Sequence, residues 1–109
     1  MQLPTEVFGD VVVVHSPEEL GADQADAFEH FLAETTPRQI VLDIDNTETL
    51  DSQGLTALLN AHDQARKQGG DLKIATSTAV NRKILEITRL DHQLDVFDSV
   101  IDAVRSFRA

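Results

Sequence analysis

The clearest pattern of hydrophobic positions lies in the middle of the chain. Residues 40–44 form an apolar run of strand length that is interrupted only by Asp43. A run this apolar and this short is typical of a strand covered on both faces, which predicts a central place in a sheet. A helical period follows, with apolar or small positions at Leu55, Leu58, Leu59, His62 and Ala65. The other side of this segment is polar, so the pattern predicts an amphipathic helix that ends at Gly69-Gly70.

The chain before this stretch predicts two strands and a helix. Residues 5–8 and 11–15 are expected to be strands joined by a tight turn at Gly9-Asp10, at the edge of the sheet. A helix is expected to begin near Asp23 and to end before Thr36-Pro37. Its predicted buried face consists of Ala25, Phe28, Phe31 and Leu32.

The chain after this stretch repeats the alternation of strand and helix. Strands are predicted at residues 72–76 and 94–97. Each is followed by a helix, the first capped by Ser77 or Thr78 and the second by Asp98 or Ser99. The side chains expected to point inward are Val80, Ile84 and Ile87 in the first helix, and Val100, Ile101, Val104 and Phe107 in the second.

These elements together predict an α/β fold. Alternating strands and helices favour parallel neighbours with right-handed crossovers. We therefore expect a mostly parallel sheet of four to five strands, with an N-terminal edge hairpin and about four helices. A chain of 109 residues suits one domain over residues 1–109, with enough buried surface for one core.

Composition narrows the classes of partner. The net charge is -10, and a surface of this sign repels both nucleic acid and anionic membranes. The chain has no cysteine and no apolar run near the ~20 residues of a membrane span. We expect a cytoplasmic protein that inserts into no membrane, binds no nucleic acid and uses no cofactor.

Polar side chains gather where the central strand ends and the next helix begins. They are Asp43, Asp45, Asp51 and Ser52. Ser52 stands where the N-cap residue of the helix belongs, since its hydroxyl can accept a bond from a first-turn amide. In open α/β sheets functional groups lie at the carboxyl ends of strands, so this segment is the predicted site, although geometry alone names no reaction.

The residues of this segment also carry a family resemblance. Leu50-Asp51-Ser52-Gln53-Gly54-Leu55, six residues after the strand Val41-Leu42-Asp43-Ile44, resembles the signature of the STAS domain family of bacterial anti-sigma factor antagonists. The order and spacing of Gly69-Gly70, residues 80–91 and Val96-Phe97-Asp98-Ser99 are similar to the family as well. The resemblance covers nearly the whole chain and implies a single STAS-like domain without catalysis of its own.

The resemblance implies a partner and a modification. In antagonists of this family the serine that matches Ser52 is phosphorylated by a partner that is both anti-sigma factor and kinase, with an ATP-binding fold of the histidine-kinase type. The residues expected to contact this partner are Gly21, Asp23, Thr49, Asp51, Ser52, Gln53 and Gly54. Several positions depart from the family pattern, namely Gly21, Thr47, Thr49, Gln53 and Arg89. The first four flank the expected interface, so the departures concern the partner and the modification and leave the fold unaffected.

Single residues of this segment have more than one interpretation. Asp51 can bond loop amides, orient Ser52 toward a kinase, or be an ordinary loop carboxylate. Gly54 can let the partner backbone or a neighbouring strand approach closely.

Two other functions remain open at this point. The domain could be a constitutive interaction subunit of a stress-signalling assembly or a transport system, with Ser52 only a helix cap. Asp43-Ile44-Asp45-Asn46-Thr47 also matches the nucleophile motif of haloacid dehalogenase-like phosphatases. That motif falls on the third strand, no acidic pair follows a later strand, and the chain is short for a core and a cap. We expect Asp43 and Asp45 to be turn residues whose side chains bond nearby amides.

No metal site is expected, because the four histidines show no ligand spacing. His62 lies on the apolar stripe of its helix and is interpreted as a histidine at the edge of the core. The oligomeric state is not defined by these patterns.

Overall fold

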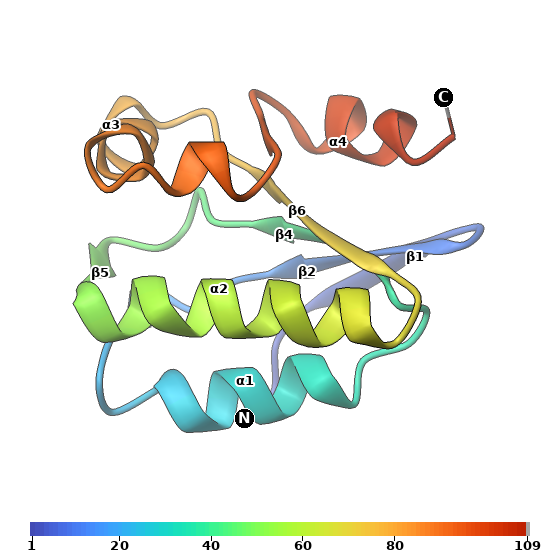
Figure 1. The fold of residues 1–109 in the computed structure, drawn as a ribbon, viewed down its shortest axis with the longest axis horizontal. Helices are drawn as coiled ribbons and strands as arrows, with labels where there is room; N and C mark the ends of the chain where they lie inside the picture. Colours follow the sequence, from blue (N-terminus) through green and yellow to red (C-terminus); the bar gives the residue numbers. More distant parts are fainter. Residues whose placement is uncertain (109) are drawn as a thin grey trace.

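A five-stranded sheet runs through the middle of the molecule (Figure 1). The structure is a computed structural model and describes residues 1–108. The strand order is β1-β2-β4-β6-β7, and only β1 runs antiparallel to its neighbour. The strands are β1 (Thr5–Phe8), β2 (Val11–His15), β4 (Gln39–Asp43), β6 (Asp71–Ala75) and β7 (Val96–Phe97). The predicted mostly parallel sheet with a hairpin at its edge is therefore confirmed.

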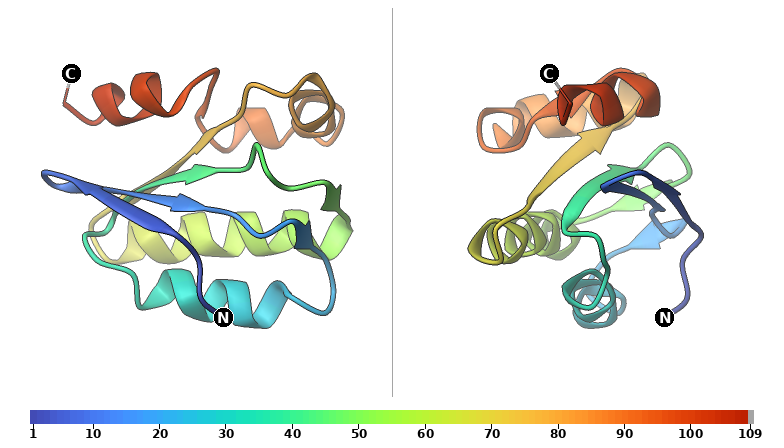
Figure 2. Two further views of the ribbon diagram at one scale, coloured as in Figure 1. Left: turned by 180° about the vertical axis from the view of Figure 1, so that it is seen from behind. Right: turned by 90° about the vertical axis from the view of Figure 1, so that its right-hand side faces the viewer.

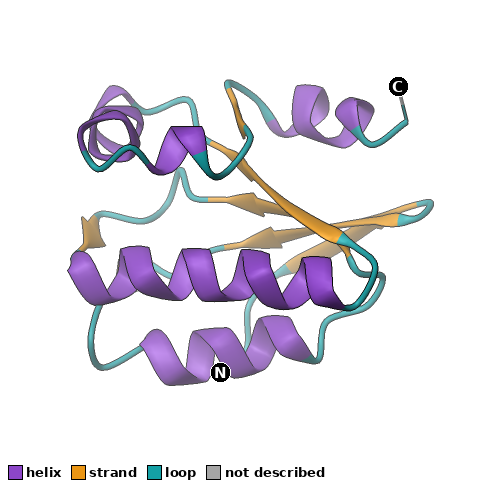
Figure 3. Cartoon of the chain, viewed as in Figure 1, coloured by secondary structure: helices purple, strands orange, loops and turns teal. Residues whose placement is uncertain are grey.

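Helices cover both faces of the sheet (Figures 2 and 3). On one face α1 (Ala25–Ala33) and α2 (Ser52–Lys67) lie side by side. On the other side α4 (Val100–Ser106) lies over the strands. Beyond the carboxyl ends of β4 and β6 lie α3 (Ala79–Ile87) and a short 3-10 helix, Leu90–His92. The four predicted α-helices are thus present, and the main core lies between the sheet and the α1–α2 layer.

The alternation of side chains along the strands produces two core layers. Successive strand residues point to opposite faces, so each buried strand contributes to both layers. The layer under α1 and α2 includes Val12, Val14, Ile40, Leu42, Leu72 and Ile74, and the layer under α4 includes Val11, Val13, Val41 and Ala75. Lys73 also points toward α4, where its Nζ lies 4.2 Å from the ring centre of Phe107 and donates to Ser106 Oγ at 2.8 Å. A cation over an aromatic ring helps to hold α4 on the sheet.

The predicted inward face of α3 is wrong in part. Val80 and Ile87 are exposed, while Asn81 and Leu85 are buried. Asn81 Nδ2 donates to the carbonyl oxygens of Ile44 at 2.9 Å and Thr47 at 3.1 Å. These bonds give a polar side chain partners inside the protein, so the helix turns Asn81 inward and leaves two apolar side chains outside.

Smaller differences concern the ends of helices. Ile101 is exposed where an inward position was predicted, and Ala103 occupies the buried position on α4. The first helix begins at Ala25 rather than near Asp23, because residues 21–24 form a turn in which the amide of Gln24 donates to the Gly21 carbonyl. Thr78 caps α3 and Ser99 caps α4, and each is one of the two capping residues predicted for its helix.

Candidate functional site

A second, two-stranded sheet lies at the start of α2 and was not predicted. β3 (Glu19–Leu20) runs parallel to β5 (Thr49–Leu50). The amides of Glu48 and Thr49 also donate to the Glu18 carbonyl, at 2.8 and 3.2 Å. This short ladder places the segment before α1 beside the segment that leads into α2 (Figure 3).

Asp51 joins these two segments. Its Oδ1 accepts from the backbone amides of Gln53 at 3.0 Å and Gly54 at 2.9 Å. Its Oδ2 accepts from the amide of Ala22 at 3.3 Å. Asp51 is therefore the N-cap residue of α2, and the prediction that Ser52 is the cap is wrong. A carboxylate has two oxygens and a full charge, so it can accept from three amides on two different segments, whereas a hydroxyl has a single uncharged oxygen.

Two glycines allow this close packing. A Cβ on Gly54 would overlap the carbonyl oxygen of Leu20, and one on Gly21 would lie 2.7 Å from Asp51 Oδ2. Both glycines are buried. The prediction that Gly54 lets a neighbouring strand approach is confirmed, with β3 as that strand. Gly21 makes room for the Asp51 carboxylate inside the chain, so its position does not offer a partner an open surface.

The remaining predicted contact residues lie on the surface around the start of α2. Thr49, Asp51, Ser52 and Gln53 are exposed, as is Asp23 in the turn before α1. Ser52 is the first residue of α2, and its carbonyl accepts from Thr56 Oγ1 at 3.0 Å. Within residues 1–108 no side-chain hydrogen bond engages the Ser52 hydroxyl. We call this group of five exposed residues the Ser52 surface.

The Ser52 surface is acidic. Residues 1–65 carry 13 carboxylates and a single Lys or Arg, Arg38. The guanidinium of Arg38 donates to the carbonyls of Leu32 and Thr35, near the far end of α1. Exposed carboxylates surrounding Ser52 are those of Glu18, Glu19, Asp23, Glu48 and Asp51. A partner that docks here meets a negative surface.

A second polar cluster lies at the carboxyl end of β4. Asp45 accepts from Ser77 N at 2.7 Å, Ser77 Oγ at 2.8 Å and Thr76 Oγ1 at 3.0 Å. Burial opposes ionisation of Asp45, but these hydrogen bonds outweigh it and lower the pKa of the carboxyl. Asp43 Oδ1 accepts from the amide of Asp45 at 2.9 Å. The turn role predicted for Asp43 is confirmed, whereas Asp45 connects its turn to the loop after β6.

His15 is a member of this cluster that sequence reasoning missed. Its Nε2 lies 2.8 Å from Glu6 Oε1, and its Nδ1 lies 3.0 Å from Asp43 Oδ2. The hydrogen bond with Glu6 raises the pKa of the imidazole, burial lowers it, and Asp43 raises it further, so that the net shift is upward. Adjacent carboxyl ends of β2 and β4 could have indicated the pairing with Asp43, whereas nothing in the sequence indicated Glu6.

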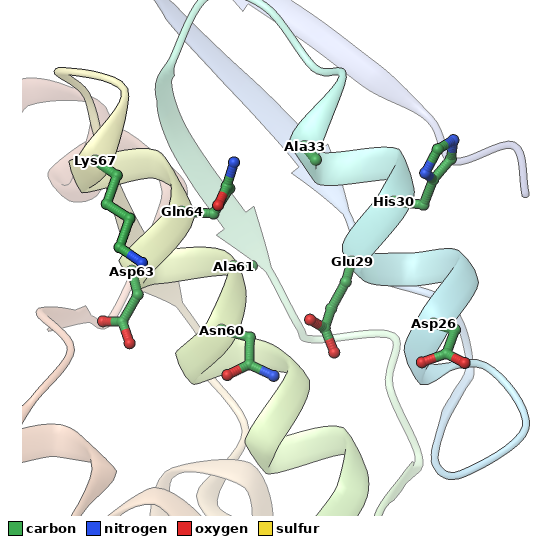
Figure 4. A pocket seen from close by; sticks show the side chains of 9 residues that line it. All are labelled: Asp26, Glu29, His30, Ala33, Asn60, Ala61, Asp63, Gln64 and Lys67. Carbon is green, nitrogen blue, oxygen red and sulfur yellow. The ribbon is translucent and has the colours of Figure 1, made fainter.

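A groove of about 520 Å³ lies between α1 and α2 (Figure 4). Asp26 and Glu29 from α1 and Asn60 and Asp63 from α2 line its walls. In the described part of the chain no three His, Cys, Asp or Glu side chains lie close enough together to hold a metal ion. His62 lies in α2 with 13% of its side chain exposed, near Asp63 and Asp71, which agrees with its interpretation as a core-edge histidine.

The fold and the site define a small α/β domain that displays a serine at the mouth of a helix. The family model of the STAS domain matches residues 2–103, and the chain therefore belongs to the STAS domain family. A Thermotoga maritima protein provisionally named as an anti-sigma factor antagonist is 22% identical over 109 residues, which cover 96% of each chain. The crystal structure of a Thermotoga maritima protein of the same description, also 22% identical, has a TM-score of 0.86 over 98% of this chain and 95% of that one.

Two further solved structures share the fold. An anti-sigma factor antagonist from Mycobacterium paratuberculosis has a TM-score of 0.85 at 23% identity, over 99% of this chain and 94% of that one. The anti-sigma factor antagonist SpoIIAA in its unphosphorylated form has a TM-score of 0.76 at 14% identity, over 98% and 96% of the two chains. These structures show that the chain shares their fold along almost its whole length. Among residues 1–108 no helix is long and apolar enough to cross a membrane.

Proposed function

We propose that this domain is an anti-sigma factor antagonist, without catalysis of its own, whose binding to an anti-sigma factor kinase is switched off by phosphorylation of Ser52. The kinase would have an ATP-binding fold of the histidine-kinase type. The observation that carries the proposal is the exposed Ser52 at the first position of α2, beside a fixed N-cap and a parallel two-stranded ladder. The family of the chain and the names of its relatives support the same function.

The local structure can accept a phosphate at Ser52. A phosphoserine carries about -1.5 to -2 charge and three acceptor oxygens. The amino end of a helix favours negative charge by about 0.3–1 kcal/mol, while the neighbouring Asp51 carboxylate opposes it. Because Asp51 itself holds the Gln53 and Gly54 amides, the cap does not depend on the Ser52 hydroxyl. Phosphorylation should therefore leave the fold intact.

The effect of the phosphate is expected at the partner surface. An unmodified Ser52 presents a small hydroxyl that an interface can cover at little cost. A phosphate at the same place adds bulk and a dianion to a surface that already carries Glu48 and Asp51. Burying a charge that lacks a partner is strongly unfavourable, so the modified surface loses affinity.

The experiment uses the purified chain, the candidate anti-sigma factor kinase and labelled ATP. Ser52→Ala is expected to bind like the native chain and to incorporate no phosphate. Ser52→Asp is expected to bind at least tenfold more weakly, which corresponds to about 1.4 kcal/mol. Isothermal titration and phosphopeptide mass spectrometry measure the two properties.

Two matched variants separate position from charge. Gln53→Asp adds the same charge one residue further along α2, on another exposed side chain, and is expected to weaken binding less than Ser52→Asp. Ser77→Ala removes an exposed serine near the start of α3 and is expected to leave phosphorylation unchanged. Equal binding by Ser52→Ala and Ser52→Asp would discard the switch. A stable partner complex with unmodified Ser52 in the presence of ATP would instead identify a constitutive interaction subunit.

A further inference from the structure

β1 is the outer strand of the sheet, and all four of its residues are exposed (Figure 2). The amide of His15 donates to the Pro4 carbonyl at 3.0 Å. Backbone groups alternate in direction along an antiparallel ladder, so Glu6 and Phe8 also turn their backbone groups toward β2. It follows that the N–H and C=O groups of Thr5 and Val7 point away from the sheet.

The side chains of this edge are unusually apolar for a solvent-facing strand. Val7 is 62% exposed and Phe8 43%. Pairing across the ladder with Val12 and Val11 places Val7 on the α1 face and Phe8 on the α4 face. Within Thr5–Phe8 the single charged residue, Glu6, is paired with His15, and there is no Lys, Pro or interruption of the β1–β2 ladder to keep the strand edge from pairing.

A hollow lies beside β1 on each face of the sheet. The one on the α1 face has a volume of about 320 Å³ and is lined by Thr5, Val7 and Phe31, among others. The one on the α4 face has a volume of about 200 Å³ and is lined by Phe8, Val100, Ile101, Val104 and Arg105. The exposed Ile101, which the sequence pattern placed inside, is thus part of the apolar surface next to the strand edge.

We infer that the outer edge of β1 pairs antiparallel with β1 of a second copy of this chain, so that two sheets join into one across a two-fold axis. Pairing Val7 with its counterpart uses the free backbone groups of both copies. In this register Glu6 lies opposite Phe8 of the other copy rather than opposite the other Glu6, so no two carboxylates face each other. The axis also brings the two hollows of each face together.

Charge favours this edge over the rest of the surface. Two chains of net charge -10 repel each other most where their carboxylates meet, as they would at the Ser52 surface. At the β1 edge Glu6 is held by His15 at 2.8 Å and the nearby Glu34 lines one hollow. Arg105 lines the other hollow, and Arg108 donates to the Phe8 carbonyl at 3.2 Å. In the proposed register Glu6 of one copy lies opposite Phe8 of the other, beside the Arg108 that bonds the Phe8 carbonyl, so charges of opposite sign meet across the axis.

The first test measures the oligomeric state by sedimentation velocity over a wide range of protein concentration. The native chain is expected to form a dimer that dissociates on dilution. Val7→Lys places two ammonium groups at the centre of the pairing and removes apolar contact, which should raise the dissociation constant by roughly 100-fold or more. Val80→Lys changes a valine of similar exposure, 69%, on α3 and is expected to leave the dimer intact. Circular dichroism checks that both variants are folded.

A second measurement follows amide hydrogen exchange at low and high protein concentration. The amides of Thr5 and Val7 are expected to exchange more slowly as the dimer forms, while those of Glu6 and Phe8, which already face β2, change little. A chain that stays monomeric at the highest concentration would overturn the inference. So would a dimer that Val7→Lys leaves unchanged, or exchange at Thr5 and Val7 that does not depend on concentration.

Discussion

Asp51 holds two segments of the chain together through one carboxylate. It caps α2 through the amides of Gln53 and Gly54 and reaches across to the amide of Ala22. Aspartate and serine are equally good N-cap residues, so the sequence alone does not decide which of the adjacent residues Asp51 and Ser52 caps α2. The structure resolves it, because one carboxylate oxygen of Asp51 holds the amides of Gln53 and Gly54 while the other reaches Ala22, 29 residues earlier.

The first prediction concerns Asp51. Asp51→Ala should lower the free energy of unfolding by about 1–2 kcal/mol, because the cap and the bridging bond are both lost. Urea denaturation measures this. Asp23→Ala removes another exposed carboxylate of the Ser52 surface and should change the free energy by less than about 0.5 kcal/mol. Equal effects of the two substitutions would contradict the bridging role of Asp51.

All five residues of the Ser52 surface were named from the sequence, but the contacts that arrange them were not. The motif around Ser52 and its place between strand and helix follow from the sequence, since they depend on local pattern. The internal role of Gly21 does not follow, because it depends on where the Asp51 carboxylate lies. His15 and Glu6 were missed for the same reason, as their contact joins separate strands.

At the scale of elements, the strands and helices with a clear period of hydrophobic positions were predicted, whereas the short strands β3 and β5 were not. β3 and β5 have two residues each, too few to show a period. On α3 the period is present but was assigned to the wrong face. Apolar side chains were taken as the buried ones, whereas the bonds of Asn81 to Ile44 and Thr47 determine how the helix is turned. The pattern of hydrophobic positions along a sequence does not indicate tertiary hydrogen bonds of this kind.

A second prediction concerns the strands that His15 connects. Glu6 on β1 and Asp43 on β4 both face His15 on β2, and together they hold its pKa above the ordinary value of 6.5. A raised pKa in the folded state stabilises the protein below the unfolded pKa, and this contribution is lost as pH rises through the folded pKa. The free energy of unfolding should therefore fall between roughly pH 6 and pH 8.

The His15 contribution can be separated from that of other groups by substitution. His15→Gln should flatten the fall in unfolding free energy over this pH range, as measured by urea denaturation at several pH values. His30→Gln should preserve it, because 76% of the His30 side chain is exposed. A pH dependence that is the same in native chain and His15→Gln would refute the assignment.

The whole molecule is electrically asymmetric. Of its 19 carboxylates 13 lie in residues 1–65, and eight of its nine Lys and Arg residues lie in the remainder. The Ser52 surface belongs to the acidic part, whereas Arg82 and Lys83 lie on α3, Arg105 lies on α4 and Arg108 follows α4. An anti-sigma factor that docks on the Ser52 surface should therefore offer a positive surface in return.

This asymmetry gives a prediction about binding kinetics. The association rate constant with the anti-sigma factor should fall by roughly tenfold as salt is raised, because screening removes the attraction that guides the encounter. The dissociation rate should change much less. Surface plasmon resonance at several salt concentrations measures both rates. An association rate that is indifferent to salt would mean that the acidic surface is not the one that meets the partner.

The small ladder of β3 and β5 stands apart from the five-stranded sheet. Leu20 and Leu50 tie it to the main core, so side-chain packing fixes this corner together with a few backbone bonds and the Asp51 carboxylate. A kinase that modifies Ser52 would therefore meet the serine at the start of an intact helix, in the position that this corner gives it.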